Sequence, residues 1–348
     1  MNSFLENAGK VEQLLNTKKK LVAYHRDTDG TTSAALLLRF FPSETLPLES
    51  PTLDPLTVYK IKEKKPDLII FLDLAIDQDW KEIHELEKTV RILIIDHHLF
   101  DRDLNSTKTL YVNPRFERKD TYLAAAYLVY HLLKKMGKDI KKYAWIAGIG
   151  VIGDYAFGEG KDVLDDVRAL SPALLKGTNP RESLLAEGGK IISSAITVAG
   201  DKGGEKALHA LVQAETFEEF AEGKELAKWK GEVEKEIILI LKDFEKKREF
   251  YPAKNISIFT VESRLPVIST ISTLLAEKYP DMTLCIKRRD EEGFKISLRN
   301  QSGRVDLNAI ARTATKGIGR GGGHEKAAGA FVTDWEMFKK RFLKELEK

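Results

Sequence analysis

Six side chains in this 348-residue sequence have the chemistry of metal ligands, and they lie at or just beyond the ends of apolar segments. They are His25, Asp27, Asp29, Asp73, His97 and Asp154. Imidazole and carboxylate groups suit Mn²⁺, Mg²⁺ or Zn²⁺, and the single cysteine, Cys285, lies in a largely apolar run where it offers no thiolate to a softer metal. These ligands are more than one ion needs. We therefore expect two ions that share a carboxylate, an arrangement suited to the hydrolysis of phosphate esters.

Three apolar segments position most of these groups, and each has the length and composition of a buried strand. Residues 21–24 lead into His25, residues 67–73 end at Asp73, and residues 92–95 lead into Asp96-His97-His98. Strands that alternate with helices form a parallel sheet, and ligands bind beyond the carboxyl ends of its strands. We predict that the three strand ends lie along one edge of a doubly wound sheet, where Asp73 is best placed to bridge two ions.

The segment after the first strand has two interpretations. His25, Asp27 and Asp29 alternate along the chain, so an extended backbone would direct all three side chains to one side. The same residues also suit an Asp-rich turn that caps the helix predicted over residues 31–41. We expect ligands, because a histidine and two carboxylates at this spacing exceed what a helix cap requires.

Two further residues complete this candidate site. Asp154 is either another ligand or simply the terminus of the apolar helix predicted over residues 141–152. His98 is redundant as a ligand once His97 is used. We therefore expect His98 to donate to a phosphate oxygen or to protonate the leaving group.

A glycine-rich run near the end of the chain has the chemistry of an anion site. Gly321, Gly322 and Gly323 let backbone N–H groups approach an anion without interference from a Cβ atom. Arg320 and His324, on either side of these glycines, would add side-chain donors. The run lacks the Gly-Lys-Ser/Thr ending of a P-loop, and its other interpretation is a flexible loop.

The pattern of residues around the glycine run predicts a small, separate α/β domain. Strands are predicted over residues 256–261, 283–287, 294–298 and 330–333. Ser297 and Arg299, at the end of the third of these strands, are candidate partners for the anion at the glycine run.

The length of the chain allows two domains. We predict a catalytic domain over residues 1–204, a helical connector over residues 205–252 and a second domain over residues 253–348. The long, charged, helix-like segment 217–250 forms most of the connector. Gly188-Gly189 and Gly203-Gly204 are expected to interrupt the helical pattern that precedes it.

Composition narrows the class of protein. The apolar fraction of 43% supplies ordinary cores, and 56 Lys and Arg against 53 Asp and Glu give a net charge of +3, which does not by itself indicate nucleic-acid binding. One cysteine excludes an intrachain disulfide framework, and no apolar stretch approaches the roughly 20 residues of a membrane span. The start of the chain does not resemble a signal peptide. We expect a cytoplasmic protein, and the dense Lys and Glu residues favour a thermophilic source.

The ordered motifs resemble the DHH phosphoesterase family. His25-x-Asp27-x-Asp29-Gly30, Asp73, Asp96-His97-His98 and Gly153-Asp154 are similar to the four motifs of that family. Ser297-x-Arg299 and Gly321-Gly322-Gly323-His324-x-x-Ala327-Ala328-Gly329 resemble the DHHA1 domain that follows it in RecJ-like nucleases and NrnA-like oligonucleotide phosphodiesterases. The resemblance implies an N-terminal parallel-sheet DHH domain and a smaller C-terminal α/β DHHA1 domain.

The resemblance also implies roles for these residues. One ion would be held by His25, Asp27 and Asp73, and the other by Asp29, Asp73, His97 and Asp154. Asp96 would orient the ligand histidine, and His98 would face the scissile phosphate. Arg299 and His324 would bind nucleic-acid phosphates across a cleft between the domains. Mn²⁺ is the implied metal, with Mg²⁺ as the alternative.

Two departures separate the chain from bacterial RecJ proteins. Those proteins have an acidic residue where His25 stands, and they carry an OB-type domain whose pattern is not recognised in these 348 residues. The chain therefore resembles a compact archaeal RecJ-like nuclease, and the polarity of the bacterial enzyme is not transferred to it.

The leading hypothesis is a Mn²⁺-dependent exonuclease that degrades single-stranded DNA or RNA to mononucleotides, 3′-to-5′, in DNA repair, replication or RNA turnover. The nearest alternative is an NrnA-like phosphodiesterase of short oligonucleotides or cyclic dinucleotides. A replication scaffold is the non-enzymatic alternative, and a family II-type pyrophosphatase would leave the glycine-rich domain without a role. A helicase or replication factor is the expected kind of protein partner, and the apolar segment 237–241 favours self-association.

Overall fold

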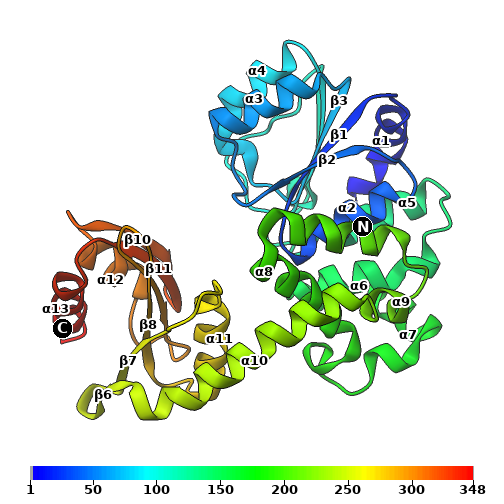
Figure 1. The fold of residues 1–348 in the computed structure, drawn as a ribbon. Coiled ribbons are helices and arrows are strands. Elements are labelled where there is room, and N and C mark those ends of the chain that lie inside the picture. The colour runs from blue at the N-terminus through cyan, green and yellow to red at the C-terminus, as the bar shows by residue number, and fades with distance from the viewer. Residues whose placement is uncertain (1–2, 348) are drawn as a thin grey trace. The chain divides into compact units, whose positions relative to one another are not determined.

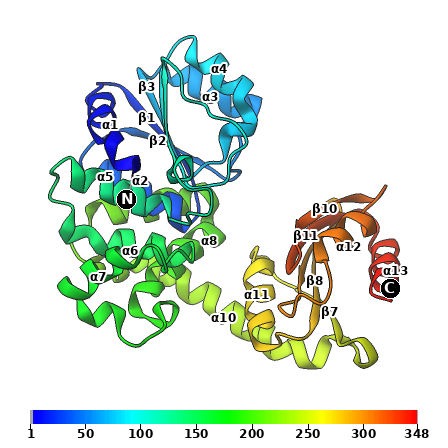
Figure 2. The same cartoon turned by 180° about the vertical axis from the view of Figure 1, so that it is seen from behind.

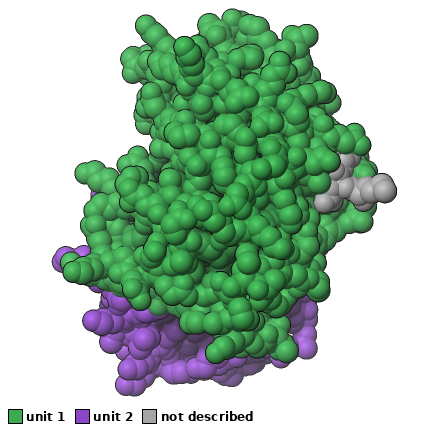
Figure 3. Space-filling model, turned by 90° about the vertical axis from the view of Figure 1, so that its right-hand side faces the viewer, with its two compact units in different colours: residues 1–230 green, residues 231–348 purple. Residues whose placement is uncertain are grey.

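The structure, a computed structural model, describes residues 3–347 and forms two compact units, residues 1–230 and 231–348 (Figures 1 and 3). The strands of the first unit are β1 (Lys20–His25), β2 (Glu44–Leu48), β3 (Leu68–Leu72), β4 (Arg91–Ile95) and β5 (Thr109–Val112). Its helices are α1 (Ala8–Leu15), α2 (Thr28–Leu38), α3 (Pro55–Lys64), α4 (Trp80–Glu87), α5 (Ala125–Lys135), α6 (Ala144–Gly153), α7 (Lys161–Leu170), α8 (Leu184–Gln213) and α9 (Phe217–Ala221). Helix α10 (Lys224–Lys247) contains the boundary between the units.

The first unit is built on a five-stranded parallel sheet with the strand order β2-β1-β3-β4-β5. Strands β1, β3 and β4 coincide with the three apolar segments of the sequence, and the predicted doubly wound arrangement is confirmed. Strand β2, an edge strand that contains Pro47, was not predicted from the sequence. Proline is tolerated at a sheet edge, where one side of the strand needs no backbone donor.

Both faces of this sheet are buried, which explains why the central strands are apolar throughout. Helices α3 and α4 cover one face, where Ile61 and Leu86 pack against alternate strand residues such as Phe71. Helices α1, α2 and α5 cover the other face, where Leu37 and Leu128 pack against residues such as Ile70 (Figures 1 and 2).

Helix α8 corrects one prediction from the sequence. Gly188-Gly189 lie inside this helix and do not break it, whereas the backbone leaves helical geometry at Gly200, where φ is +58°, three residues before Gly203-Gly204. The prediction was wrong at the first pair and misplaced the break at the second, and these glycines provide space for close contacts. A Cβ atom on Gly188 would lie 2.4 Å from Cδ1 of Ile149, and one on Gly203 would lie 1.9 Å from a backbone oxygen.

The second unit contains a six-stranded sheet with the order β10-β11-β9-β8-β7-β6. Its strands are β6 (Glu249–Tyr251), β7 (Ile256–Thr260), β8 (Thr283–Arg289), β9 (Phe294–Arg299), β10 (Gly319–His324) and β11 (Ala327–Val332). Its helices, besides part of α10, are α11 (Ile268–Lys278), α12 (Leu307–Ala314) and α13 (Trp335–Glu345). Helices α12 and α13 pack on one face through residues such as Ile310 and Phe338.

The glycine run forms a strand, so its interpretation as a loop is wrong. Residues Gly319–His324 are β10, which pairs antiparallel with β11. Strand β11 pairs in turn with β9, so the glycines lie next to the strand that carries Ser297 and Arg299. Within residues 3–347, no helix combines the length and the apolar character that crossing a membrane requires.

Candidate metal centre

The carboxyl ends of β1, β3 and β4 bring the predicted ligands to one edge of the parallel sheet. Strand β1 ends at His25, β3 is followed at once by Asp73, and β4 is followed by Asp96 and His97. Strand β3 lies between β1 and β4, so Asp73 is flanked by polar groups on both sides. This is the position that the sequence predicts for a bridging carboxylate.

Backbone conformation at this edge is unusual at Asp73. Its φ is +59°, a left-handed value that costs a non-glycine residue about 1–3 kcal/mol and tends to occur at functional sites. Gly30 is also required by its surroundings, because a Cβ atom there would lie 2.0 Å from the backbone oxygen of His25. The chain therefore returns tightly on itself between His25 and the start of α2.

The first group of ligand atoms comes from His25, Asp27 and Asp73. Nδ1 of His25 lies 3.1 Å from Oδ2 of Asp27 and 3.5 Å from Oδ2 of Asp73. One ligand atom from each of the three residues lies within 4.8 Å of the others. Asp27 also accepts a hydrogen bond from the backbone N–H of Gly30 at 2.9 Å and caps α2.

The second group comes from Asp29, His97 and Asp154, which likewise lie within 4.8 Å of one another. Nε2 of His97 lies 3.9 Å from Oδ2 of Asp29, and Nδ1 of His97 lies 3.7 Å from Oδ2 of Asp154. The Asp73 carboxylate joins this group to the first, because its Oδ1 lies 3.2 Å from Nε2 of His97.

The Asp-rich segment forms the helix cap that one interpretation predicts, and its side chains also lie in the groups that could hold a metal ion. The segment is not extended through Asp29, as one-sided alternation would require, because Asp27 caps α2 and Asp29 lies in the first turn. Asp29 instead reaches the N-terminus of α5, where it accepts hydrogen bonds from the backbone N–H groups of Ala125 and Ala126 at 2.6 and 2.9 Å. Its position beside His97 therefore depends on a helix about a hundred residues later in the chain.

Asp96 has a different neighbour from the one we expected. Its Oδ1 lies 2.7 Å from Nδ1 of His98, whereas the imidazole of His97 faces Asp73, Asp29 and Asp154. The chain turns at His98, whose backbone N–H also donates to Oδ2 of Asp96 at 3.2 Å, and the rings of His97 and His98 lie side by side with centroids 4.5 Å apart. Asp96 therefore orients His98, whose side chain is 36% exposed, rather than the candidate ligand His97.

The cluster combines buried carboxylates with protonated histidines. Burial opposes protonation of His25, yet hydrogen bonds to Asp27 and Asp73 raise its pKa to about 10. Burial also opposes protonation of His97, yet its hydrogen bond to Asp73 raises the pKa of His97 to about 10. Burial raises the pKa of Asp154 to about 6, and the charge of Asp73 acts in the same direction. The raised pKa values of both imidazoles and of the Asp154 carboxyl group thus reflect how closely carboxyl groups are crowded at this buried site.

This donor set fits divalent metal ions. Nδ1 of His97 and Oδ2 of Asp154 are buried, face each other and have no hydrogen-bond partner among the described residues. Atoms of this kind are the ligands that Mn²⁺, Mg²⁺ and Zn²⁺ take in proteins. A cation between them would satisfy both atoms and neutralise the charge of Asp29 and Asp73.

The end of β5 supports the cluster through contacts that were not predicted from the sequence. Nδ2 of Asn113 donates to the backbone oxygen of His98 at 3.0 Å, and Nε of Arg115 donates to that of His97 at 2.7 Å. This support could have been predicted, because a parallel strand next to β4 must end at the same edge of the sheet as the cluster. Tyr122 was also missed, although its ring contacts the imidazole of His97 with centroids 5.9 Å apart.

The predicted anion-binding residues lie on one face of the second unit's sheet. Antiparallel register places Arg299, Ala327 and His324 side by side, and Ser297, Gly329 and Gly322 side by side in the neighbouring row. Arg320 lies on the same face two positions before Gly322, whereas Gly321 and Gly323 alternate to the other face. Ser297 is buried, Arg299 is half-buried, and Arg320 and His324 are exposed.

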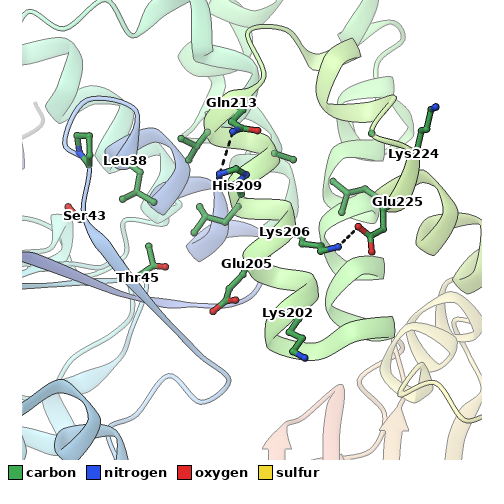
Figure 4. Close-up of a pocket in the computed structure, with 16 residues that line it drawn as sticks. Leu38, Ser43, Thr45, Lys202, Glu205, Lys206, His209, Gln213, Lys224 and Glu225 are labelled. Carbon is green, nitrogen blue, oxygen red and sulfur yellow. Dashed lines mark hydrogen bonds and ion pairs between the residues drawn. The ribbon is translucent and has the colours of Figure 1, made fainter. Parts of the chain in front are cut away.

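A surface cavity of about 990 Å³ lies elsewhere in the first unit (Figure 4). It is formed by the end of α2, the start of β2, the second half of α8 and the start of α10, with His209 and Lys206 projecting from α8. None of its lining residues belongs to the metal cluster, so the chemistry of the chain is not concentrated in this cavity.

Comparisons with known proteins agree with this division into two units. The family model for the N-terminal domain of the DHH family matches residues 19–153, and the DHHA1 domain model matches residues 260–348. No curated protein matches the sequence significantly.

Several solved structures share the fold. An exonuclease RecJ bound to manganese is 20% identical with a TM-score of 0.70, over 99% of this chain and 93% of that one. RecJ from Thermus thermophilus in complex with Mn²⁺ is 21% identical with a TM-score of 0.74, over 100% of this chain but 54% of that one. The pGpG-specific phosphodiesterase PggH from Vibrio cholerae is 13% identical with a TM-score of 0.53, over 95% of this chain and 99% of that one. At these identities the likeness concerns the fold.

Proposed function

Because the chain belongs to the DHH family of phosphoesterases, with a DHHA1 domain after its DHH domain, we propose that it is a Mn²⁺-dependent exonuclease. It removes mononucleotides from single-stranded DNA or RNA. The observation that carries this proposal is the pair of ligand groups joined by Asp73, since phosphodiester hydrolysis commonly uses two adjacent metal ions. The 3′-to-5′ polarity is proposed from the resemblance to compact archaeal relatives.

Each ligand group would hold one ion. His25, Asp27 and Asp73 would bind the first, and Asp29, Asp73, His97 and Asp154 would bind the second. Divalent ions, when bound, neutralise charge on the phosphoryl oxygens and lower the pKa of a water molecule. Mg²⁺ is the alternative to Mn²⁺, and both metals occur in complexes of RecJ from Thermus thermophilus.

His98 would act on the substrate itself. Its Nδ1 is held by Oδ1 of Asp96 at 2.7 Å, so the ring orientation is fixed. The remaining ring nitrogen, Nε2, is then free to donate a proton to a phosphate oxygen or to the leaving group. Asp96 is in this way a positioning residue.

The second unit would bind the strand being degraded. Ser297, Arg299, Arg320 and His324 share a sheet face with Gly322, and Arg side chains are well suited to phosphate groups. We propose that residues 253–348 bind nucleic acid, that residues 205–252 connect them to the catalytic domain, and that residues 1–204 carry out hydrolysis.

A second candidate is a phosphodiesterase of very short oligonucleotides or cyclic dinucleotides. The observation that supports it is the fold shared with the pGpG-specific phosphodiesterase over 99% of that chain, a share similar to the 93% of the manganese-bound exonuclease RecJ. A replication scaffold without activity is disfavoured, because all six candidate ligands are present and close together.

Length and end preference of the substrate distinguish these functions. Single-stranded DNA and RNA, labelled at either end, and the dinucleotide pGpG would each be incubated with Mn²⁺ or Mg²⁺. The proposed exonuclease shortens a 5′-labelled strand progressively. Hydrolysis of pGpG with little action on longer strands would favour the phosphodiesterase of short substrates over the exonuclease. If no substrate is hydrolysed under any condition, the replication scaffold is the remaining hypothesis.

A further inference from the structure

Tyr122 lies against the metal cluster but is not one of its candidate ligands. Its ring and the imidazole of His97 form a T-shaped contact, with centroids 5.9 Å apart and an interplanar angle of 74°. Its hydroxyl donates a hydrogen bond to the backbone oxygen of Asp154 at 3.0 Å. The ring therefore contacts one candidate ligand and is bonded to the backbone of another.

The position of this ring is fixed from three sides. Besides the contacts with His97 and Asp154, the backbone N–H of Tyr122 donates to Oε2 of Glu159 at 2.9 Å. The residues that follow begin α5, whose first N–H groups bind Asp29. Tyr122 thus lies directly before the backbone groups that position a buried carboxylate of the cluster.

Despite these contacts, the residue is 43% exposed. The ring makes up most of the surface of a tyrosine side chain, so part of this exposed area belongs to the ring. A rigid, exposed ring loses little conformational entropy when a ligand packs on it. An aromatic surface of this kind beside a phosphate-cleaving centre matches the flat bases of nucleotides, which stack on aromatic side chains whatever their sequence.

We propose that Tyr122 stacks on the nucleobase of the nucleotide whose phosphodiester is bound at the metal cluster. The inference rests on the proposed function and narrows its substrate class, because an enzyme for simple phosphate esters or pyrophosphate gains nothing from this contact. Tyr122 is then a substrate-binding residue that favours nucleotides, whereas the ligands and His98 act on the phosphate.

A purely structural role is the competing explanation, since the hydroxyl of Tyr122 also supports the backbone at Asp154. Two substitutions separate these roles. Tyr122→Phe keeps the ring and removes the hydroxyl, whereas Tyr122→Leu keeps an apolar side chain of moderate size and removes the aromatic surface. Stacking predicts that Tyr122→Phe behaves like the unaltered protein and that Tyr122→Leu does not.

Kinetics with abasic substrates measure the contact directly. Short single strands would carry a tetrahydrofuran residue in place of the base at the 3′-terminal or the 5′-terminal nucleotide. Loss of the base at the attacked end should raise KM between about fivefold and about a hundredfold for the unaltered Mn²⁺-loaded protein. In Tyr122→Leu the intact strand should show that higher KM, and removal of the base should then have little further effect.

Binding provides a readout that does not depend on hydrolysis. Calorimetry would compare a nucleoside monophosphate with ribose 5-phosphate in the presence of Mn²⁺. The monophosphate should bind more tightly than the sugar phosphate to the unaltered protein and to Tyr122→Phe, and equally to Tyr122→Leu. If this pattern holds while no nucleic acid is cleaved, the inference stands and the proposed exonuclease does not.

The matched control is Tyr59→Leu. Tyr59 is also an exposed tyrosine with a bonded hydroxyl, which donates to Glu63 at 2.7 Å, but it lies on α3 and contributes nothing to the cluster. The substitution Tyr59→Leu should change neither the KM values nor the binding affinities. Two results overturn the inference: equal KM for intact and abasic strands in the unaltered protein, or a fall in kcat alone that is shared by Tyr122→Phe and Tyr122→Leu.

Discussion

Oδ1 of Asp73 lies 3.2 Å from Nε2 of His97, and this contact joins the ends of two adjacent parallel strands, β3 and β4. The other oxygen of the same carboxylate lies 3.5 Å from Nδ1 of His25, at the end of β1. Asp73 therefore contacts an imidazole on each side, because β3 lies between β1 and β4 in the sheet. A carboxylate in this position can bind two ions at once.

Replacing Asp73 should remove metal binding from both groups. Asp73→Asn keeps the shape of the side chain and tolerates the left-handed backbone, so we expect a folded protein without hydrolysis and with much weaker Mn²⁺ binding. Asp73→Ala should show the same loss and, in addition, a free energy of unfolding lower by about 1 kcal/mol. Calorimetric titration with Mn²⁺ and urea denaturation measure the two effects.

Asp77→Asn is the control for these variants. Asp77 is also a buried carboxylate, but it accepts a hydrogen bond from the backbone N–H of Asp101 and is not part of the cluster. An amide oxygen can still accept that bond, so hydrolysis should be retained. Activity in Asp73→Asn comparable to that in Asp77→Asn would show that Asp73 is not a ligand.

Divalent metal should stabilise the first unit. Asp29, Asp73 and Asp96 are each at most 2% exposed, so several carboxyl groups are held together away from water. At a Mn²⁺ concentration about a hundred times Kd, binding to the folded state should add about 2.7 kcal/mol to the free energy of unfolding. For a domain of this size that corresponds to a rise in Tm of roughly 5–11 °C.

Differential scanning calorimetry with Mn²⁺, and then with excess EDTA, tests this expectation. Asp73→Asn provides the comparison, because it should lose most of the metal-dependent rise in Tm. If the unaltered protein shows no rise, or if both proteins show the same one, the cluster does not bind the ion.

The main lines of the fold follow from the sequence because local patterns carry them. Apolar runs before His25, Asp73 and Asp96 predict the three central strands, and parallel pairing then places their polar ends together. Strand β2 escaped prediction because Pro47 interrupts its pattern, and β10 because glycines have little strand preference. Both depend on tertiary pairing, since β2 pairs with β1 and β10 with β11.

The details of the candidate site depend on contacts that sequence spacing cannot supply. Asp29 is positioned by the backbone of α5, and Tyr122 by residues at the end of α6 and beyond. The pairing of Asp96 with His98 depends on the bend of the chain at His98, where both the backbone N–H and the ring of His98 contact the Asp96 carboxylate.

Close packing around Asp29 provides a further test. A Cβ atom on Gly150 would lie 2.9 Å from Oδ1 of Asp29, 2.6 Å from Cβ of Ala126 and 2.5 Å from Oγ1 of Thr32. Gly150→Ala should therefore displace this carboxylate and lower the free energy of unfolding by about 1–3 kcal/mol, although alanine is the better helix former. Mn²⁺ affinity should fall as well, and calorimetric titration would measure it.

Gly158→Ala is the matched control for this substitution. Gly158 lies only four residues beyond Asp154, but a Cβ atom there would have no atom within 4 Å. Stability and Mn²⁺ affinity should be close to those of the unaltered protein. A similar result for Gly150→Ala would mean that the first turn of α2 can move without disturbing the ligands.

The proposed nucleic-acid face of the second unit can be tested by its dependence on salt. Arg299 and His324 lie in one row across β9, β11 and β10, so both can contact the same strand of nucleic acid. Arg299→Gln should weaken binding of single-stranded DNA about tenfold to a hundredfold, with little dependence on sequence. The slope of log K against log salt should decrease by about 0.7, which corresponds to one phosphate contact. Lys340→Ala removes a charge from an exposed position on α13 and should change neither quantity, whereas equal effects of the two substitutions would indicate that only net charge matters.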